Sequence, residues 1–206
     1  MITKVQGKTL AGELAVSREP KLTALERAML KWAVVDPDDK LLDANVGAGM
    51  MAEYLRRNMQ CEVCGVSDNM DHVRYARSRL QTCDIIYAPA GDIPWREDSF
   101  DTVLMRLNAE EPEMLHRMFG EAHRVLKPGG QLILGTMYYP AAVSAIANVF
   151  AEESLSEFKP FQRSAIMEML SGCSFENITW QRTGFTTGVM IAWKSKPEVE
   201  QLRNAG

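Results

Sequence analysis

Short apolar segments alternate with amphipathic segments along the middle of the chain, from about Lys40 to Tyr139. The apolar segments have the length of buried strands, and they lie at 40–46, 61–66, 84–90, 101–107 and 131–139. Apolar residues recur at helical spacing in the segments between them, at 49–59, 69–81 and 112–126. This alternation predicts an α/β fold, in which a mostly parallel sheet has helices on both faces.

The flanks of this region predict further elements. Residues 22–35 have helical spacing, and Thr23 and Glu26 have the spacing of a capping box. After residue 139 the rhythm changes to two successive helices and then to two strands joined by a short turn around Gly184. The helices lie at 141–153 and 163–173, and the strands at 175–183 and 186–195. With this antiparallel pair the predicted sheet has seven strands, and we expect a single domain over residues 1–206.

Charge and hydropathy argue against several classes of partner. The 206 residues carry a net charge of −4, so no basic field points to nucleic acid or to an anionic membrane. No apolar run approaches the roughly 18 residues of a membrane-spanning helix. The first 20 residues have no apolar segment long enough for a signal peptide. We therefore expect a cytoplasmic protein that does not enter the membrane, as a monomer or a homodimer.

Two of the four cysteines, Cys61 and Cys64, form a CxxC pattern, which can indicate zinc binding or redox chemistry. The pair falls in a strand-like segment, where side chains three positions apart point to opposite faces of the sheet. A redox CxxC normally opens a helix, and zinc would need a second pair of ligands. We therefore predict buried, unreactive thiols and no metal site.

The stretch LLDANVGAGM, at 41–50, indicates a buried strand that runs into a glycine-containing loop before a helix. In an open parallel sheet, ligands bind beyond the carboxyl ends of the strands. Gly47 and Gly49 permit close backbone approach, and the loop amides can bind a polar or anionic group. With Ala52 they also satisfy the dinucleotide fingerprint. The loop alone therefore fits a nucleoside site, an NAD site or a tight turn without a ligand.

Three segments occur in a characteristic order: LLDANVGAG, GDIPWREDSFDTVLMR and EAHRVLKPGGQLIL. Together they resemble class I S-adenosylmethionine-dependent methyltransferases, in particular the small single-domain kind that acts on small molecules. The resemblance covers roughly Leu25 to Thr136. It implies a Rossmann-like sheet, S-adenosylmethionine as cofactor, S-adenosylhomocysteine as product and a small-molecule methyl acceptor. It also implies an N-terminal extension or cap, a cofactor-binding core, a helical acceptor-side region, a closing strand pair and a tail, at 1–20, 40–139, 140–172, 173–195 and 196–206.

The resemblance assigns the glycine loop to the amino-acid portion of the cofactor. Asp43 matches the acidic residue that ends the first strand near that portion, and the loop beneath it is formed by Ala44, Asn45, Gly47 and Gly49. In the family pattern D-x-G-x-G-x-G, the first glycine is replaced here by Asn45. Asparagine is the least costly substitute for glycine in a left-handed backbone, but its side chain occupies space where a ligand would approach.

The remaining segments supply the adenine side and the methionine end. Asp92 matches the residue that accepts a hydrogen bond from the adenine amino group, and Ile93 packs beside the ring. Arg106 and Leu107 end the fourth strand beneath the methionine end. The segment LKPGG, at 126–130, is implied to be a sharp stop and turn into the fifth strand.

A second departure from the family pattern lies at the end of the second strand. The family usually has an acidic residue there, which binds both ribose hydroxyls, whereas this chain has Ser67 followed by Asp68. Charge-assisted bonds to the two hydroxyls contribute on the order of 1.5–3 kcal/mol each. Asp68 fits two roles equally well from sequence, as a ribose ligand or as the N-cap of the following helix.

Methyl transfer from a sulfonium is a displacement that depends chiefly on alignment, so no catalytic triad is required and the catalytic residues stay unidentified. His72, His116 and His123 lie in predicted helices away from the strand ends, which predicts surface or structural roles. Tyr138 and Tyr139 follow the fifth strand and fit either an acceptor pocket or packing.

Three functions remain open from the sequence. The first is a small-molecule methyltransferase that works by direct displacement. The second is a catalytically weak or inactive member of the fold that acts as a binding or regulatory protein, which Asn45 and Ser67 motivate. The third is an NAD-linked enzyme, based on the fingerprint alone.

Overall fold

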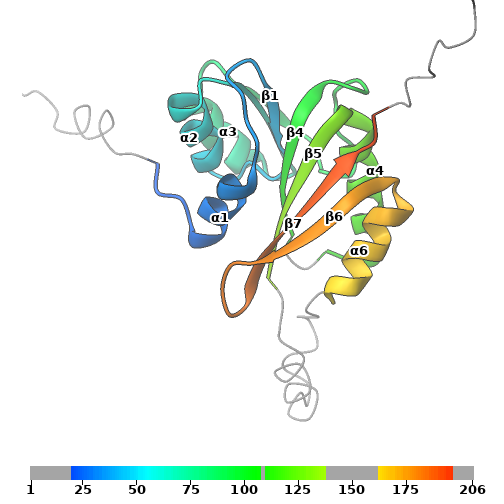
Figure 1. Cartoon of the computed structure of the whole chain (residues 1–206). Helices are drawn as coiled ribbons and strands as arrows, with labels where there is room; N and C mark the ends of the chain where they lie inside the picture. The colour runs from blue at the N-terminus through cyan, green and yellow to red at the C-terminus, as the bar shows by residue number, and fades with distance from the viewer. Residues whose placement is uncertain (1–19, 108–109, 138–161, 197–206) are drawn as a thin grey trace, which may run out of the picture.

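The protein's computed structural model describes residues 20–107, 110–137 and 162–196, which form one mixed sheet with helices on both faces (Figure 1). The seven strands follow the order β3-β2-β1-β4-β5-β7-β6. Their bounds are β1 Lys40–Asp43, β2 Glu62–Ser67, β3 Asp84–Tyr87, β4 Phe100–Arg106, β5 Leu126–Met137, β6 Phe175–Arg182 and β7 Thr187–Lys194. Strands β1 to β5 pair in parallel, and β7 is antiparallel to both β5 and β6. The predicted fold class is confirmed, including the closing antiparallel pair.

The described helices cover the sheet from both sides. They are α1 Ala24–Trp32, α2 Met50–Asn58, α3 Met70–Arg79, α4 Pro112–Val125 and α6 Arg163–Gly172. Helices α1, α2 and α3 lie on one face, and α4 and α6 lie on the other (Figure 1). None of these helices has the length and apolar character that crossing a membrane requires. The helix predicted at 141–153 lies outside the described residues, and the division of the domain stays a prediction.

Each face of the sheet buries its own apolar cluster, because successive side chains of a strand point to opposite sides. Leu42 and Val103 pack with the α4 side, whereas Leu41 and Leu104 pack with the side of α1 and α2. Cys61 belongs to the second cluster and Cys64 to the first, so the predicted separation of the CxxC pair is confirmed. Burial raises the pKa of the Cys64 thiol to about 12, which leaves it protonated and unreactive at neutral pH.

Two predictions about local structure had different outcomes. The capping box at the start of α1 is confirmed, because Thr23 Oγ1 accepts from the Glu26 N–H at 3.1 Å and the Glu26 carboxylate accepts from the Thr23 N–H at 2.8 Å. The sharp stop at LKPGG is confirmed, because α4 ends at Val125 directly before it, whereas the expected turn before the strand is wrong, because the segment lies inside β5. The pairing with β4 shifts there, from Leu126 opposite Phe100 to Gln131 opposite Thr102. The segment is therefore an irregularity within the strand.

The strand order reverses at β1, which lies between β2 and β4. After β1 the chain builds outward through β2 to β3, and it then crosses back to place β4 on the other side of β1. The connections that leave the carboxyl ends of β1 and β4 thus run in opposite directions. Such a reversal leaves a crevice in which ligands of open α/β sheets bind.

Candidate functional site

A cavity of about 390 Å³ opens at the carboxyl edge of the sheet, where the strand order reverses. Its lining comes from the ends of β1, β2 and β4, the segment after β3 and the starts of α3 and α4. The lining residues are Ala44, Asn45, Gly47, Ser67, Asp68, His72, Pro89, Ala90, Arg106, Glu110, Met114 and Met118. Six of the eleven predicted site residues are among them: Ala44, Asn45, Gly47, Ser67, Asp68 and Arg106.

Asn45 connects the end of β1 to the end of β4. Its side-chain Oδ1 accepts from the backbone N–H of Arg106 at 3.2 Å, and its own N–H donates to Asp43 Oδ1 at 3.2 Å. Its φ is not positive, so the left-handed backbone that asparagine tolerates better than other side chains is not used here. The asparagine side chain is bonded to the neighbouring strand end. It thereby fixes the loop in a conformation that needs no glycine at this position.

Asp43 lies behind the loop and is fully buried. Its Oδ1 accepts from Asn45 and lies 3.5 Å from Arg106 Nη2, whereas Oδ2 has no hydrogen-bond partner in the described part of the chain. Burial raises the pKa of this carboxyl, and the nearby Arg106 guanidinium partly opposes the shift. An unpaired, buried carboxylate oxygen is costly for a folded protein unless a ligand or water satisfies it.

Arg106 is held from two sides. Its Nη1 donates to the Glu26 carboxylate on α1, and its Nη2 donates to the carbonyl oxygen of Asn45. Glu26 is itself buried and also caps α1, so this single carboxylate joins the first helix to the loop. The guanidinium of Arg106, which lines the cavity, therefore forms one charged cluster with the buried carboxylates of Glu26 and Asp43, which do not line it.

The end of β2 brings Ser67, Asp68 and His72 to the same side of the cavity. Ser67 Oγ accepts from the Asn69 N–H at 3.2 Å and lies 3.5 Å from His72 Nδ1. The N-cap of α3 is Asn69, which accepts from the N–H groups of Asp71 and His72. The N-cap role considered for Asp68 is therefore wrong. The prediction that His72 lies away from the strand ends is also wrong, because it occupies the first turn of α3 beside Ser67.

The two loop glycines serve different purposes. Gly47 has φ 51° and lines the cavity, and a Cβ there would meet no heavy atom closer than 3.8 Å. Gly49 has φ 77°, is buried and faces α3, where a Cβ would lie 2.8 Å from Leu80 Cδ1 and 3.3 Å from Ala76 Cβ. Gly49 therefore allows α2 and α3 to pack closely, and it does not line the cavity.

The segment after β3 is anchored to α4 through its backbone. Glu121 accepts from the Ile93 N–H at 2.7 Å, and Arg124 donates to the Ile93 carbonyl at 2.8 Å and to Glu121. The Ile93 side chain is buried in the core, and Asp92 is exposed next to it. Neither residue lines the cavity, and Leu107 is likewise a buried core residue. Their roles toward a cofactor stay predictions.

Sequence reasoning missed the other half of the cavity wall. Pro89 and Ala90 lie within three residues of the end of β3, which is a signal that the strand-end rule could have used. Met114 and Met118 lie one turn apart at the start of α4. His116 and His123 lie further along α4, and burial lowers the pKa of His123, which packs edge-on against Phe175. Tyr138 and Tyr139 lie outside the described residues.

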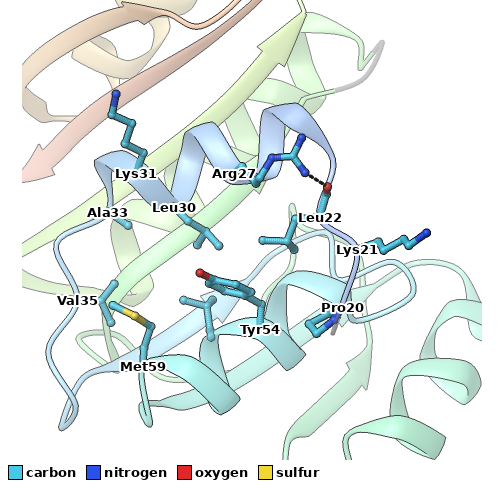
Figure 2. A pocket seen from close by; sticks show the side chains of 11 residues that line it. Pro20, Lys21, Leu22, Arg27, Leu30, Lys31, Ala33, Val35, Tyr54 and Met59 are labelled. Atoms are coloured by element: carbon cyan, nitrogen blue, oxygen red, sulfur yellow. Dashed lines mark hydrogen bonds between the residues drawn. The ribbon is translucent and has the colours of Figure 1, made fainter. Parts of the chain in front are cut away.

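A larger groove of about 790 Å³ lies between α1 and α2 (Figure 2). Leu22, Leu30 and Tyr54 give it an apolar floor, and Figure 2 shows Lys21 and Lys31 pointing away from it. None of the predicted site residues lines it. The smaller cavity, which the predicted segments share, is therefore the better candidate for the functional site.

The comparison with known families agrees with this assignment. Residues 42–134, which span β1 to β5, match the family described as a methyltransferase domain. This match, together with the strand order, supports a class I S-adenosylmethionine-dependent methyltransferase. The match contains both the glycine loop and the end of β4, so the family assignment favours the nucleoside interpretation of the loop over the dinucleotide one.

Two curated relatives have low sequence identity to this chain, and their names indicate two different methyl acceptors. A demethylmenaquinone methyltransferase of Tropheryma whipplei is 25% identical over 183 residues, which cover 77% of this chain and 75% of the relative. A 27-O-demethylrifamycin SV methyltransferase of Amycolatopsis mediterranei is 31% identical over 148 residues, and the match covers 63% of this chain and 54% of the relative. These names state the acceptors of the two relatives and do not identify the acceptor of this chain.

Solved structures share the fold. A methyltransferase from Methanosarcina mazei superposes with a TM-score of 0.66 at 20% identity and covers 79% of this chain and 95% of its own. The [4+2]-cyclase SpnF superposes with a TM-score of 0.70 at 18% identity, and the match covers 84% of this chain and 81% of the cyclase. At these identities the likeness shows the fold alone.

The described residues fit S-adenosylmethionine by three features of their own. The backbone of Gly47 borders the cavity without a side chain. The buried Asp43 Oδ2 lacks a partner, which suits a cationic or hydrogen-donating group. Ser67 and Asp68 lie together at the end of β2, where oxygen atoms can bind ribose hydroxyls. The larger groove between α1 and α2 offers none of these features.

We predict that alanine is tolerated much less well at position 49 than at position 47. Gly49→Ala combines a positive φ with a clash against Leu80 and should lower the free energy of unfolding by about 2–4 kcal/mol. Gly47→Ala carries only the backbone strain, roughly 1–2 kcal/mol. Urea unfolding of both variants checks this difference, and equal losses would contradict the packing role of Gly49.

We predict that Glu121 stabilises the fold in a pH-dependent way. The Arg124 hydrogen bonds, and secondarily the Ile93 N–H, hold the pKa of Glu121 below its usual range. A lowered carboxyl pKa gives stability that is present above the unfolded pKa and is lost as the pH falls through the folded pKa. Glu121→Gln should therefore cost about 1 kcal/mol of unfolding free energy at pH 7, after allowance for partial exposure, and progressively less in acid.

Urea unfolding at pH 7 and at about pH 3.5, where most carboxyls are close to protonation, measures this difference. Glu168→Gln is the matched control, because Glu168 is an exposed carboxyl on α6. A loss for Glu121→Gln that is the same at both pH values would contradict the role assigned to its charge.

Proposed function

We propose that the protein is an S-adenosylmethionine-dependent methyltransferase that transfers a methyl group to a small-molecule acceptor. The observation that carries the proposal is that the glycine loop after β1, the end of β2 and the end of β4 line one cavity at the reversal of the sheet. Family membership supports the cofactor, and the small-molecule acceptors named for the relatives support the acceptor class.

In this proposal the cavity wall divides by chemistry. Asp43 and the loop at Ala44, Asn45 and Gly47 hold the amino-acid portion of the cofactor. Ser67 and Asp68 bind the ribose hydroxyls in place of the acidic residue usual in the family. His72 adds a ring nitrogen beside them, since it lines the same wall and lies 3.5 Å from Ser67 Oγ.

When bound, S-adenosylmethionine supplies an activated methyl group on its sulfonium. The contribution of the chain is to bind and orient the cofactor, so that the acceptor atom can approach the methyl in line with the sulfur. A general base is needed only where the acceptor atom carries a proton. Met114 and Met118 give the α4 side of the cavity an apolar surface, which excludes water and suits an apolar part of either ligand.

Isothermal titration calorimetry of the full chain with S-adenosylmethionine and S-adenosylhomocysteine tests the proposal. We expect dissociation constants in the micromolar range, and NAD should give no heat above dilution. Folded protein that binds neither adenosyl ligand at 1 mM, a concentration equivalent to about −4 kcal/mol, would sink the proposal.

A second candidate is a catalytically weak or inactive binding protein, and the serine at position 67 is the observation that favours it. Under this alternative the unaltered chain binds the cofactor weakly, and Ser67→Asp should raise its affinity at least tenfold, because charge-assisted bonds to ribose hydroxyls contribute about 1.5–3 kcal/mol. Under the proposed function, Ser67 and Asp68 already bind the ribose, and the second carboxylate should change affinity by less than about threefold.

Asn45→Gly belongs in the same series. Because Asn45 Oδ1 accepts from the Arg106 N–H and the residue is not left-handed, glycine here should not improve binding. A large gain in affinity from Asn45→Gly would support the alternative, in which the asparagine obstructs the site.

A further inference from the structure

Among the residues that line the candidate cavity, Arg106 is the one with a strongly basic side chain. The lining residues otherwise include the carboxyl side chains of Asp68 and Glu110, together with His72, and none of them is another arginine or a lysine. About a fifth of the Arg106 side chain is exposed, and the residue lines the cavity. The resemblance places Arg106 beneath the methionine end of the cofactor without assigning a partner to its guanidinium.

The guanidinium lies directly beside the glycine loop. A Cβ on Gly47 would lie 3.8 Å from Arg106 Nη2, and that same nitrogen donates to the Asn45 carbonyl. In the proposed function this loop holds the amino-acid portion of the cofactor. The cation therefore lies next to the end of the ligand that carries both a carboxylate and an ammonium group.

The guanidinium belongs to a charged cluster whose two carboxylates are buried. Asp43 and Glu26 give two carboxylates and Arg106 gives one cation, and Asp43 Oδ2 has no partner within the described residues. The described hydrogen bonds of the guanidinium use one N–H on each of Nη1 and Nη2. A guanidinium has five N–H donors in a planar fork, so donors remain for a further carboxylate.

We propose that Arg106 binds the carboxylate of the cofactor's amino-acid portion and thereby makes the site select ligands that carry this carboxylate. The proposal rests on the proposed function and adds a specificity-determining residue to it. Glu26 and the Asn45 carbonyl hold the guanidinium in place before the ligand arrives, which reduces the ordering cost of binding.

A purely structural role for Arg106 makes a different prediction. In that case the guanidinium only balances the buried charge of Asp43, and its removal disturbs the loop for every ligand alike. The two roles are separated by comparing ligands that differ in the carboxylate alone. S-adenosylhomocysteine and 5′-deoxy-5′-(3-aminopropylthio)adenosine form such a pair, since the second is the first without its carboxylate.

Calorimetric titration of the full chain with both ligands tests the proposal on the wild type, Arg106→Gln and Arg106→Lys. The wild type should bind S-adenosylhomocysteine at least about tenfold more tightly than the ligand without the carboxylate. In Arg106→Gln the affinities for the two ligands should lie within about threefold of each other, mainly because S-adenosylhomocysteine binds more weakly. Arg106→Lys, which keeps a charge without the planar fork, should give an intermediate ratio.

Arg96→Gln is the matched control, because it removes an exposed arginine from the loop before β4 and should leave the ratio unchanged. Binding of the ligand without the carboxylate also reports that Arg106→Gln is folded. Equal binding of both ligands by the wild type, or an unchanged ratio in Arg106→Gln, overturns the role of Arg106 and leaves the proposed function intact. A wild type that binds neither ligand overturns the proposed function itself.

Discussion

The parallel pairing of β1 with β4 is the constraint on which the site depends. It places Asp43 beside Leu104, and the Ala44 N–H then donates to the Leu104 carbonyl at 2.9 Å. The loop after β1 consequently begins level with the end of β4, within reach of Arg106. A change of register by one residue would turn these side chains to the opposite face of the sheet and separate the loop from the arginine.

How far the sequence predicts this site depends on the range of the forces involved. The strand–helix alternation and the capping box of Thr23 and Glu26 are local, and both are legible in the sequence. The conformation of Asn45 is not legible in the sequence, because it is decided by a bond to Arg106, which lies 61 residues away. The family pattern has glycine at this position, but here the backbone N–H of Arg106 holds the asparagine side chain and fixes the conformation.

The start of α3 shows how small a local difference can hide a site residue. Asp68 and Asn69 are both good N-cap residues, and the structure uses Asn69. With that choice, His72 falls in the first helical turn beside Ser67, and Asp68 is free to face the cavity. The spacing of the histidines does not predict that His72 lies beside Ser67, because this depends on which of two adjacent residues caps the helix.

The anchoring of Ile93 has a consequence for how a chain of this kind can change. Both bonds from Glu121 and Arg124 end on main-chain atoms of Ile93, at its N–H and its carbonyl. These two bonds therefore hold the backbone after β3 whatever side chain stands at the exposed position 89, where Pro89 lines the cavity. Substitution there can alter the cavity lining while the backbone stays in place, so new ligand preferences can arise at little cost to stability.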